Sequence, residues 1–221
     1  MVHLEKSQPA PDCLTREKEK ATGDHRCGDV LQRLAHDFKD KCYLCEYKKP
    51  TSIHVDHFIP HKGDRDLKFD WNNLFLACPH CNQTKGAGYE GILNCTNKND
   101  RVDADIEYLI NPFPSFRIEI RLVIENARTR ATQALLLAVY GGNTKTKRLE
   151  SAYLRDALRE EMERFQELLW RYHGAINAEK RNDLMGRIKE HLDNASSFTA
   201  FKRWIIRGDE RLKEEFEGFF Q

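Results

Sequence analysis

The apolar positions of residues 127–220 recur every three or four residues, which is the spacing of amphipathic helices. This periodicity predicts helices over residues 127–140, 146–173, 178–193 and 197–220. The apolar face of the longest predicted helix consists of Leu154, Leu158, Phe165, Leu168, Leu169 and Tyr172. The C-terminal part of the chain is therefore expected to be mainly helical.

Apolar and polar positions alternate strictly in two stretches, as in β-strands with one buried face. Residues 116–124 alternate just before the first predicted helix, and they predict a strand or hairpin. Residues 53–60 read IHVDHFIP. Ile53, Val55 and Ile59 alternate there, which predicts a half-buried strand.

The first forty residues predict little regular structure. Residues 28–40 carry apolar side chains at helical spacing and predict one short helix. Residues 1–27 are polar and contain two prolines close together. We expect them to form an extended arm that packs on the body of the protein or docks to a partner.

The predicted strand at residues 53–60 raises a chemical question, because Asp56 and His57 occupy its middle. Burying a carboxylate and an imidazole costs free energy unless other groups pair with them. Neighbouring residues of a strand also point to opposite faces, so the two side chains can share a site only at a strand end or a distortion.

Composition and charge restrict the function classes. Hydrophobic residues make up 40% of the 221 residues and charged residues 32%, which is typical of a soluble globular protein. The N-terminal residues lack the apolar core of a signal peptide, so we expect a cytoplasmic protein without a membrane partner. With 36 basic and 35 acidic residues the net charge is +1, so any nucleic-acid surface must be local or shared with a partner.

Four of the seven cysteines form two C-x-x-C pairs, Cys42/Cys45 and Cys78/Cys81. Without a secretion signal, such pairs indicate a metal rather than disulfides. Four thiolates give Zn²⁺ a closed tetrahedral shell, so the predicted zinc is structural. The alternative is a set of unrelated core thiols. The remaining three, Cys13, Cys27 and Cys95, are expected to be ordinary thiols.

Several motifs occur in one order between residues 42 and 86: Cys42-x-x-Cys45, Val55-Asp56-His57-x-x-Pro60, Asn73-Leu74 and Cys78-x-x-Cys81-Asn82-x-x-Lys85-Gly86. This ordered set resembles the HNH endonucleases. The resemblance implies a ββα-metal fold, with two antiparallel strands, a loop and a helix around one catalytic divalent ion. The predicted class is α+β: an arm at 1–27, a zinc-clamped HNH nuclease core at 28–95 and a mainly α-helical region at 96–221.

The resemblance also implies a role for each polar residue of the motif. His57 would be the general base that activates water. Asp56 and Asn82 would bind the catalytic ion through oxygen atoms, which suit Mg²⁺ or Mn²⁺. Asn73 would hydrogen-bond the loop backbone and help to orient His57.

Weaker and alternative interpretations remain beside these roles. Lys85 or His61 could contact a substrate phosphate. Asp56 and His57 could instead form a satisfied, buried hydrogen-bonded pair. His80 could replace a cysteine at the zinc, although four thiolates leave no need for it. The other histidines are expected to pack or to face solvent: His3, His25, His36, His54, His173 and His191.

Three further stretches, LEKSQPAPDCL, KFDWNNLF and IEYLINPFPS, look like HNH proteins associated with retrons and like the HNH subunit of Septu-type anti-phage systems. That resemblance implies an ABC/SMC-like ATPase partner and a role in an anti-phage defence complex. The leading hypothesis is thus a metal-dependent endonuclease that cleaves DNA. The alternatives are cleavage of RNA and a non-catalytic zinc module that binds nucleic acid or protein.

Overall fold

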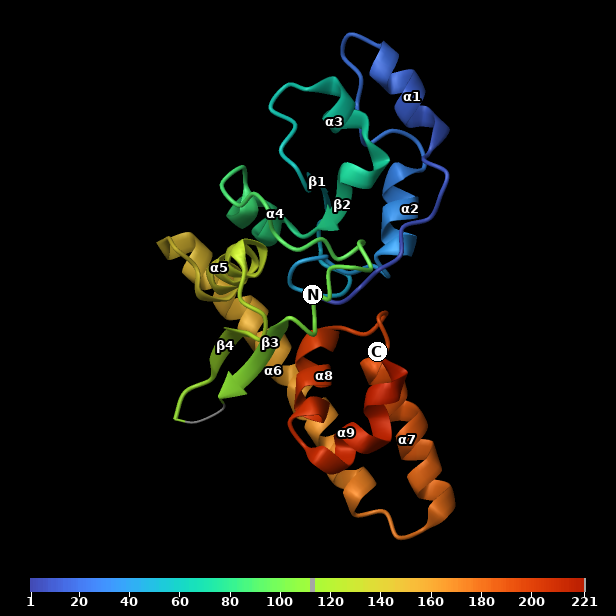
Figure 1. Cartoon of the computed structure of the whole chain (residues 1–221), viewed down its shortest axis with the longest axis vertical. Coiled ribbons are helices and arrows are strands. Elements are labelled where there is room, and N and C mark those ends of the chain that lie inside the picture. Colours follow the sequence, from blue (N-terminus) through green and yellow to red (C-terminus); the bar gives the residue numbers. More distant parts are fainter. Residues whose placement is uncertain (112–113, 221) are drawn as a thin grey trace.

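The structure is a computed structural model that describes residues 1–111 and 114–220. Figure 1 shows an elongated molecule, with the first four helices and one strand pair at one end and the last helices at the other. The helices are α1 (Asp12–Glu19), α2 (Val30–Asp37), α3 (Arg65–Phe69), α4 (Pro79–Lys85), α5 (Ala127–Gly141), α6 (Lys145–His173), α7 (Ala178–Leu192), α8 (Thr199–Arg207) and α9 (Glu210–Phe216). The strands are β1 (His54–His57), β2 (Leu74–Ala77), β3 (Ile106–Asn111) and β4 (Arg117–Leu122).

The four strands form two separate antiparallel pairs. β1 pairs with β2, and Asp56 lies opposite Phe75 while His57 lies opposite Leu74. Helix α4 follows β2 directly and packs against β1. The second pair, β3 with β4, contacts α5 and α8. Two small sheets among helices confirm the mixed α and β class.

Two groups of buried apolar side chains hold the molecule together, and α6 belongs to both. Its first half contributes Leu154 and Leu158 to a core that includes β1, β2 and the N-terminal residues. Its second half contributes Phe165 and Leu168 to a smaller core with α7, α8 and α9. At 1.5 Å per residue its 29 residues span ~43 Å, so one helix contributes to both cores.

The predicted C-terminal helices are confirmed except for the last one. Residues 197–220 do not form a single helix, because α8 ends at Arg207 and α9 begins at Glu210. Asp209 causes the second start, since its side chain accepts hydrogen bonds from the backbone of the next helix. The strand or hairpin predicted at residues 116–124 is confirmed as β4, which pairs with β3; residues 112–113 between the two strands lie outside the described part of the chain.

The arm predicted for residues 1–27 is not extended throughout, because it contains α1. Its first residues are buried in the larger core, so the arm packs on the body of the protein. Cys13 and Cys27 are not ordinary thiols, because they form a disulfide with a Cα–Cα distance of 6.1 Å. The chain folds back after α1 and brings them together, which their sequence spacing does not reveal. Cys95 is a free, buried thiol.

The strand predicted for residues 53–60 is shorter than expected. β1 has four residues, and Ile53 and Ile59 on either side of it are 39% and 52% exposed. Val55 and Asp56 are both buried, so burial does not alternate along this strand. The sequence also gave no sign of α3. Within the described residues, no helix combines the length and apolar character needed to cross a membrane.

Candidate active site

The four motif cysteines converge in the structure. Cys42 and Cys45 lie in a turn before β1, and Cys78 caps the start of α4, whose first turn contains Cys81. All four sulfurs are buried and lie within 4.8 Å of one another. The Sγ atoms of Cys45 and Cys78 are 3.9 Å apart. Four sulfurs around a tetrahedral Zn²⁺ would be ~3.8 Å apart, so the cluster fits zinc.

His80 does not take part in this cluster, although it lies between Cys78 and Cys81. Its Nδ1 is 2.8 Å from the Glu150 carboxylate and its Nε2 is 2.8 Å from the Val139 carbonyl oxygen. Both ring nitrogens are therefore engaged with α5 and α6. The four thiolates form the shell without it, as a closed structural site requires.

Alternate residues of β1 face α4 in two polar pairs. His54 Nδ1 accepts a hydrogen bond of 3.0 Å from Asn82 Nδ2. Asp56 forms an ion pair with Lys85, with oxygen–nitrogen distances of 3.2 and 3.3 Å. The spacing explains the pairing, because residues i and i+2 share a strand face and residues i and i+3 share a helix face.

Asp56 is almost completely buried, with 6% of its surface exposed. Tyr43 donates a hydrogen bond of 2.7 Å to one of its carboxylate oxygens. Burial raises the pKa of Asp56, and the charge of Lys85 and the Tyr43 hydrogen bond offset part of that shift. These partners are what allow a carboxylate to lie in this strand.

Lys85 is fully buried beside Asp56 and also donates a hydrogen bond of 2.8 Å to the His57 carbonyl oxygen. Its ammonium group thus holds both the carboxylate and the backbone at the end of β1. This position does not fit the predicted contact with a substrate phosphate, since no part of the side chain reaches the surface.

His57 is the last residue of β1, and its side chain points to a different neighbour than Asp56 does. Its Nε2 lies 3.0 Å from the Lys68 carbonyl oxygen at the end of α3. A carbonyl oxygen only accepts, so Nε2 carries the hydrogen and Nδ1 keeps the free lone pair. Burial lowers the pKa of His57, although the Lys68 hydrogen bond acts in the opposite direction. His57 therefore has one proton-accepting nitrogen at neutral pH.

Asn73 is buried at the start of β2 and binds the loop that links β1 to α3. Its Oδ1 accepts a hydrogen bond of 2.7 Å from the Ile59 backbone, and its Nδ2 donates to the carbonyl oxygens of Ile59 and Leu67 at 2.9 and 3.0 Å. Leu67 precedes Lys68, the residue that binds His57. Asn73 thus holds the loop after β1 and the residue next to Lys68.

One pocket of about 760 Å³ brings four of the predicted residues together, while Asn73 and Lys85 are not part of its lining. It is lined by Asp56, His57, His61 and Asn82. Asp56 and His57 are neighbours in β1, and both reach the pocket because His57 is the last residue of the strand. The Oδ1 atom of Asn82 has no hydrogen-bond partner among the described residues. A carboxylate and a free amide oxygen at one pocket are suitable ligands for a hard divalent cation.

Residues 42–88 match the family model of the HNH endonucleases. No curated protein matches the chain. We call residues 42–88 the HNH segment. It contains the four cysteines and the predicted motif residues, and it indicates a metal-dependent nuclease that binds nucleic acid.

The pocket of the HNH segment also contains residues that sequence reasoning missed. His54 is one, and its bond to Asn82 could have been suspected from their places in the strand and the helix. His25 and Arg26 are two more, and they come from a loop outside the HNH segment. The disulfide between Cys13 and Cys27 closes that loop, and no motif in the sequence places the loop at this pocket.

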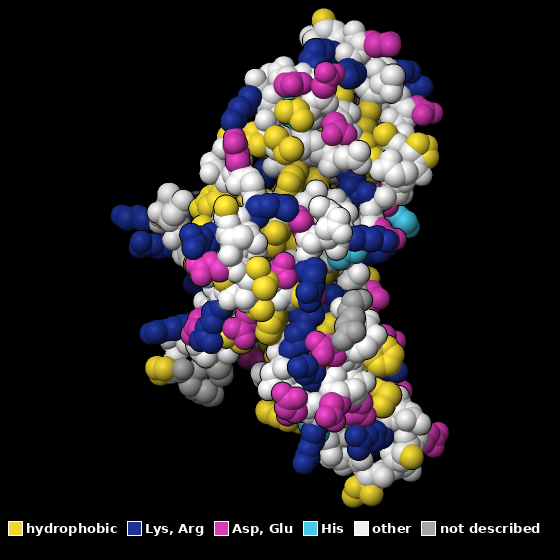
Figure 2. Space-filling model, viewed as in Figure 1, with side chains coloured by type: hydrophobic (Ala, Val, Ile, Leu, Met, Phe, Trp, Pro, Cys, Tyr) yellow, Lys and Arg dark blue, Asp and Glu magenta, His cyan; other side chains and the backbone are white. Residues whose placement is uncertain are grey.

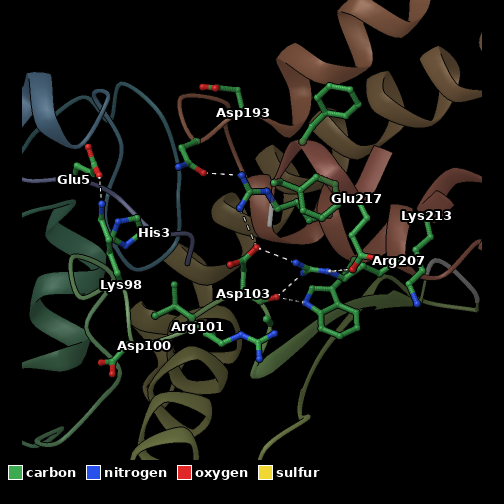
Figure 3. A pocket seen from close by; sticks show the side chains of 17 residues that line it. His3, Glu5, Lys98, Asp100, Arg101, Asp103, Asp193, Arg207, Lys213 and Glu217 are labelled. Atoms are coloured by element: carbon green, nitrogen blue, oxygen red, sulfur yellow. Dashed lines mark hydrogen bonds and ion pairs between the residues drawn. The ribbon is translucent and has the colours of Figure 1, made fainter. Parts of the chain in front are cut away.

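A larger cavity of about 1020 Å³ lies elsewhere, and all its lining residues are outside the HNH segment. Figure 3 shows several of its charged side chains in contact with each other around Asp103. Asp103 binds both Arg203 and Arg207, and Lys98 binds Glu5.

Proposed function

We propose that the protein is a metal-dependent HNH endonuclease that hydrolyses phosphodiester bonds in DNA. One observation carries the proposal: His57 is held with Nδ1 as its only proton acceptor, in the same pocket as the oxygen atoms of Asp56 and Asn82. Two antiparallel strands and a following helix provide this arrangement, which is consistent with a ββα-metal fold.

His57 is the proposed general base. Its lowered pKa leaves the imidazole neutral at physiological pH, so Nδ1 can accept a proton from water. The proton stays on a ring whose other nitrogen is bound to the Lys68 carbonyl oxygen. That bond also keeps the ring in one tautomer during proton transfer.

Asp56 and Asn82 are the proposed ligands of a catalytic Mg²⁺ or Mn²⁺. When bound, such an ion supplies positive charge for the phosphate and the leaving oxygen. Two protein ligands are typical for Mg²⁺, which keeps several waters and binds substrate phosphate. Lys85 holds the Asp56 carboxylate from the buried side, and Asn73 holds the loop. His61 lines the pocket mouth with Nδ1 bonded to the Gly63 backbone, so its Nε2–H is the candidate donor to a phosphate.

The proposed zinc at the four cysteines has a structural role. It would join the turn before β1 to the start of α4. Asp56 lies in β1 and Asn82 lies in α4. A metal in a closed thiolate shell stabilises a small fold without touching substrate.

DNA is the proposed substrate, and the charge distribution is relevant to how it binds. Basic and acidic side chains are interspersed over the face shown in Figure 2. With a net charge of +1, the chain has no excess of positive charge to bind long DNA by itself. We therefore propose that an ABC/SMC-like ATPase partner supplies part of the DNA surface in a cytoplasmic anti-phage defence complex. The sequence resemblance outside the motif supports this partner.

Two alternative functions make different predictions. A non-catalytic zinc module would need the cysteines but not His57, Asp56 or Asn82. The position of those three side chains around one pocket favours the nuclease. An RNA nuclease would use the same site, so only the substrate separates it from the proposal.

The test uses the purified full chain, alone and with the co-expressed ATPase, on supercoiled plasmid and on single-stranded RNA. We expect plasmid nicking that requires added Mg²⁺ or Mn²⁺ and is faster with the ATPase. Cleavage of RNA alone would replace the proposed substrate. A wild-type protein that carries zinc but cleaves neither nucleic acid in any of these conditions would contradict the nuclease proposal.

A further inference from the structure

Residues 23–28 form a loop that lies against the candidate active site, and we call it the 23–28 loop. It is absent from the HNH segment, yet His25 and Arg26 line the same pocket as Asp56 and His57. The histidine motif of the HNH segment is therefore covered by a part of the chain with no motif of its own.

The 23–28 loop is fastened at both ends. At one end the disulfide joins Cys27 to Cys13 in α1. At the other, the Gly23 carbonyl oxygen accepts a hydrogen bond of 2.8 Å from Lys68 Nζ. Arg65 of α3 also donates to the backbone of Lys20 at 2.7 Å. These contacts hold the loop on α3 rather than leaving it free in solvent.

Lys68 links the loop and the base directly. Its backbone oxygen accepts the hydrogen bond from His57 Nε2, while its side chain binds the loop at Gly23. The same residue therefore orients the His57 ring at one edge and fixes the loop that covers the ring.

The ring of His25 packs on the ring of His57. Their centroids are 4.6 Å apart and the planes are tilted by 58°. His61 packs on His57 as well, at 4.7 Å. One hydrogen bond at Nε2 does not fix the plane of an imidazole, so these two ring contacts limit its rotation about the Cβ–Cγ bond.

We propose that His25 is a positioning residue for the general base: its ring, carried by the 23–28 loop, holds the His57 ring in the orientation that proton transfer needs. This inference rests on the proposed nuclease function. It extends the active site to a residue outside the HNH segment.

Contact rather than charge is the basis of this role. The side chain of His25 is 17% exposed, and its Nδ1 is buried without a hydrogen-bond partner among the described residues. Burial, followed by the proximity of His57, lowers the pKa of His25 to about 4. At neutral pH the ring is uncharged, so an uncharged ring of similar shape should replace it.

The kinetic test compares His25→Ala with His25→Phe in Mg²⁺-dependent nicking of supercoiled plasmid. His25→Ala should lower kcat about tenfold or more with little change in KM, because a misplaced base slows chemistry rather than binding. His25→Phe should keep most of the wild-type kcat. An equal loss of kcat in both variants would mean that the nitrogen atoms of His25 matter. An unchanged kcat in His25→Ala would mean that the ring contact does not matter. Either result overturns the proposal.

His3→Ala is the matched control, since His3 is a partly buried histidine of the N-terminal residues that lines the other cavity in Figure 3. It should leave kcat unchanged. An equal fall of kcat in His3→Ala would show general loosening of the N-terminal residues and would overturn the positioning role.

A second measurement does not depend on cleavage. In protein labelled with ¹⁵N histidine, the His57 Nε2–H should give a sharp, exchange-protected signal in the wild type and in His25→Phe, and a broadened or lost signal in His25→Ala. An unchanged His57 signal in folded His25→Ala would overturn the inference. If the wild type shows the signal but cuts no nucleic acid, the proposed function fails while the ring contact stands.

Discussion

The HNH segment and the helices α6–α9 are stabilised in different ways. In the HNH segment the regular elements are short, with four residues each in β1 and β2 and seven in α4. α6 alone has 29 residues, and its far half packs in an apolar core with α7, α8 and α9. The HNH segment belongs to the larger apolar core, and its short elements are joined in addition by the four-cysteine cluster.

The difference has a functional consequence. In the helices α6–α9 the buried Lys202 pairs with Glu161. The HNH segment buries Asp56, Asn73 and Lys85 and satisfies each with partners. These buried polar groups are the ones that face or support the pocket. The partners of these polar groups and the cysteine cluster thus hold the side chains of the pocket in place. They also make the segment sensitive to the loss of a single cysteine.

Removal of one cysteine ligand should have the largest effect on the stability of the HNH segment. We expect Cys45→Ala to lose zinc and to unfold the HNH segment, because binding of structural zinc supplies ~10–16 kcal/mol in small zinc peptides. Limited proteolysis should then cut within residues 42–88 first, while circular dichroism keeps most of the helical signal. Cys95→Ala is the control, since Cys95 is equally buried but outside the cluster. Full zinc content in Cys45→Ala would contradict the assignment.

A change in the apolar core of the helices should lower stability without removing zinc. Ile188 of α7 is fully buried in that core, and we expect Ile188→Ala to lower the free energy of unfolding by about 2–5 kcal/mol. Urea unfolding measures this loss, and metal analysis should still find one zinc per chain. Loss of zinc in the folded variant would mean that the two regions are not stabilised separately.

The smallest predicted effect concerns Glu161, which joins α6 to His191 of α7 and Lys202 of α8. Burial alone would raise its pKa, but the His191 ring nitrogen 3.4 Å away and the charge of Lys202 outweigh burial and lower it to about 2. Burial also lowers the pKa of Lys202 to about 8, so this partner stays charged throughout the acid range. The pH dependence of stability in the acid range therefore follows the titration of Glu161.

A lowered carboxyl pKa stabilises the fold above the unfolded value of 4.5, and that stability is lost as the pH falls toward about 2. Glu161→Gln should thus be less stable than the wild type at pH 6 by about 1 kcal/mol, and the difference should shrink between pH 4.5 and 2. Thermal unfolding across this range measures it. A difference independent of pH would show that the pair carries no ionic stabilisation.

The sequence predicted what depends on local pattern. Helical spacing identified α5, α6 and α7 with nearly correct limits, and residue type with spacing identified the four cysteines. The interruption at Gly208 escaped notice because apolar residues continue through it at helical spacing. The cap at Asp209 decides that break, and it involves only a few backbone groups.

The rest of the candidate site depends on contacts between distant segments. A lysine is expected at the surface, yet Lys85 is buried because Asp56 neutralises it. His25 reaches His57 only because the chain folds back after α1 and the disulfide closes the loop. Neither partner can be identified from the residues next to it in sequence.

In the proposed nuclease, one segment uses the cysteines for folding and His57 for chemistry. Mg²⁺-dependent nicking of supercoiled plasmid by His57→Ala tests it most directly, with zinc content and thermal stability measured on the same protein. We predict a loss of cleavage by a factor of ~10²–10⁴, with one zinc per chain and an unchanged melting temperature. Wild-type nicking by a folded, zinc-bearing His57→Ala protein would contradict the claim.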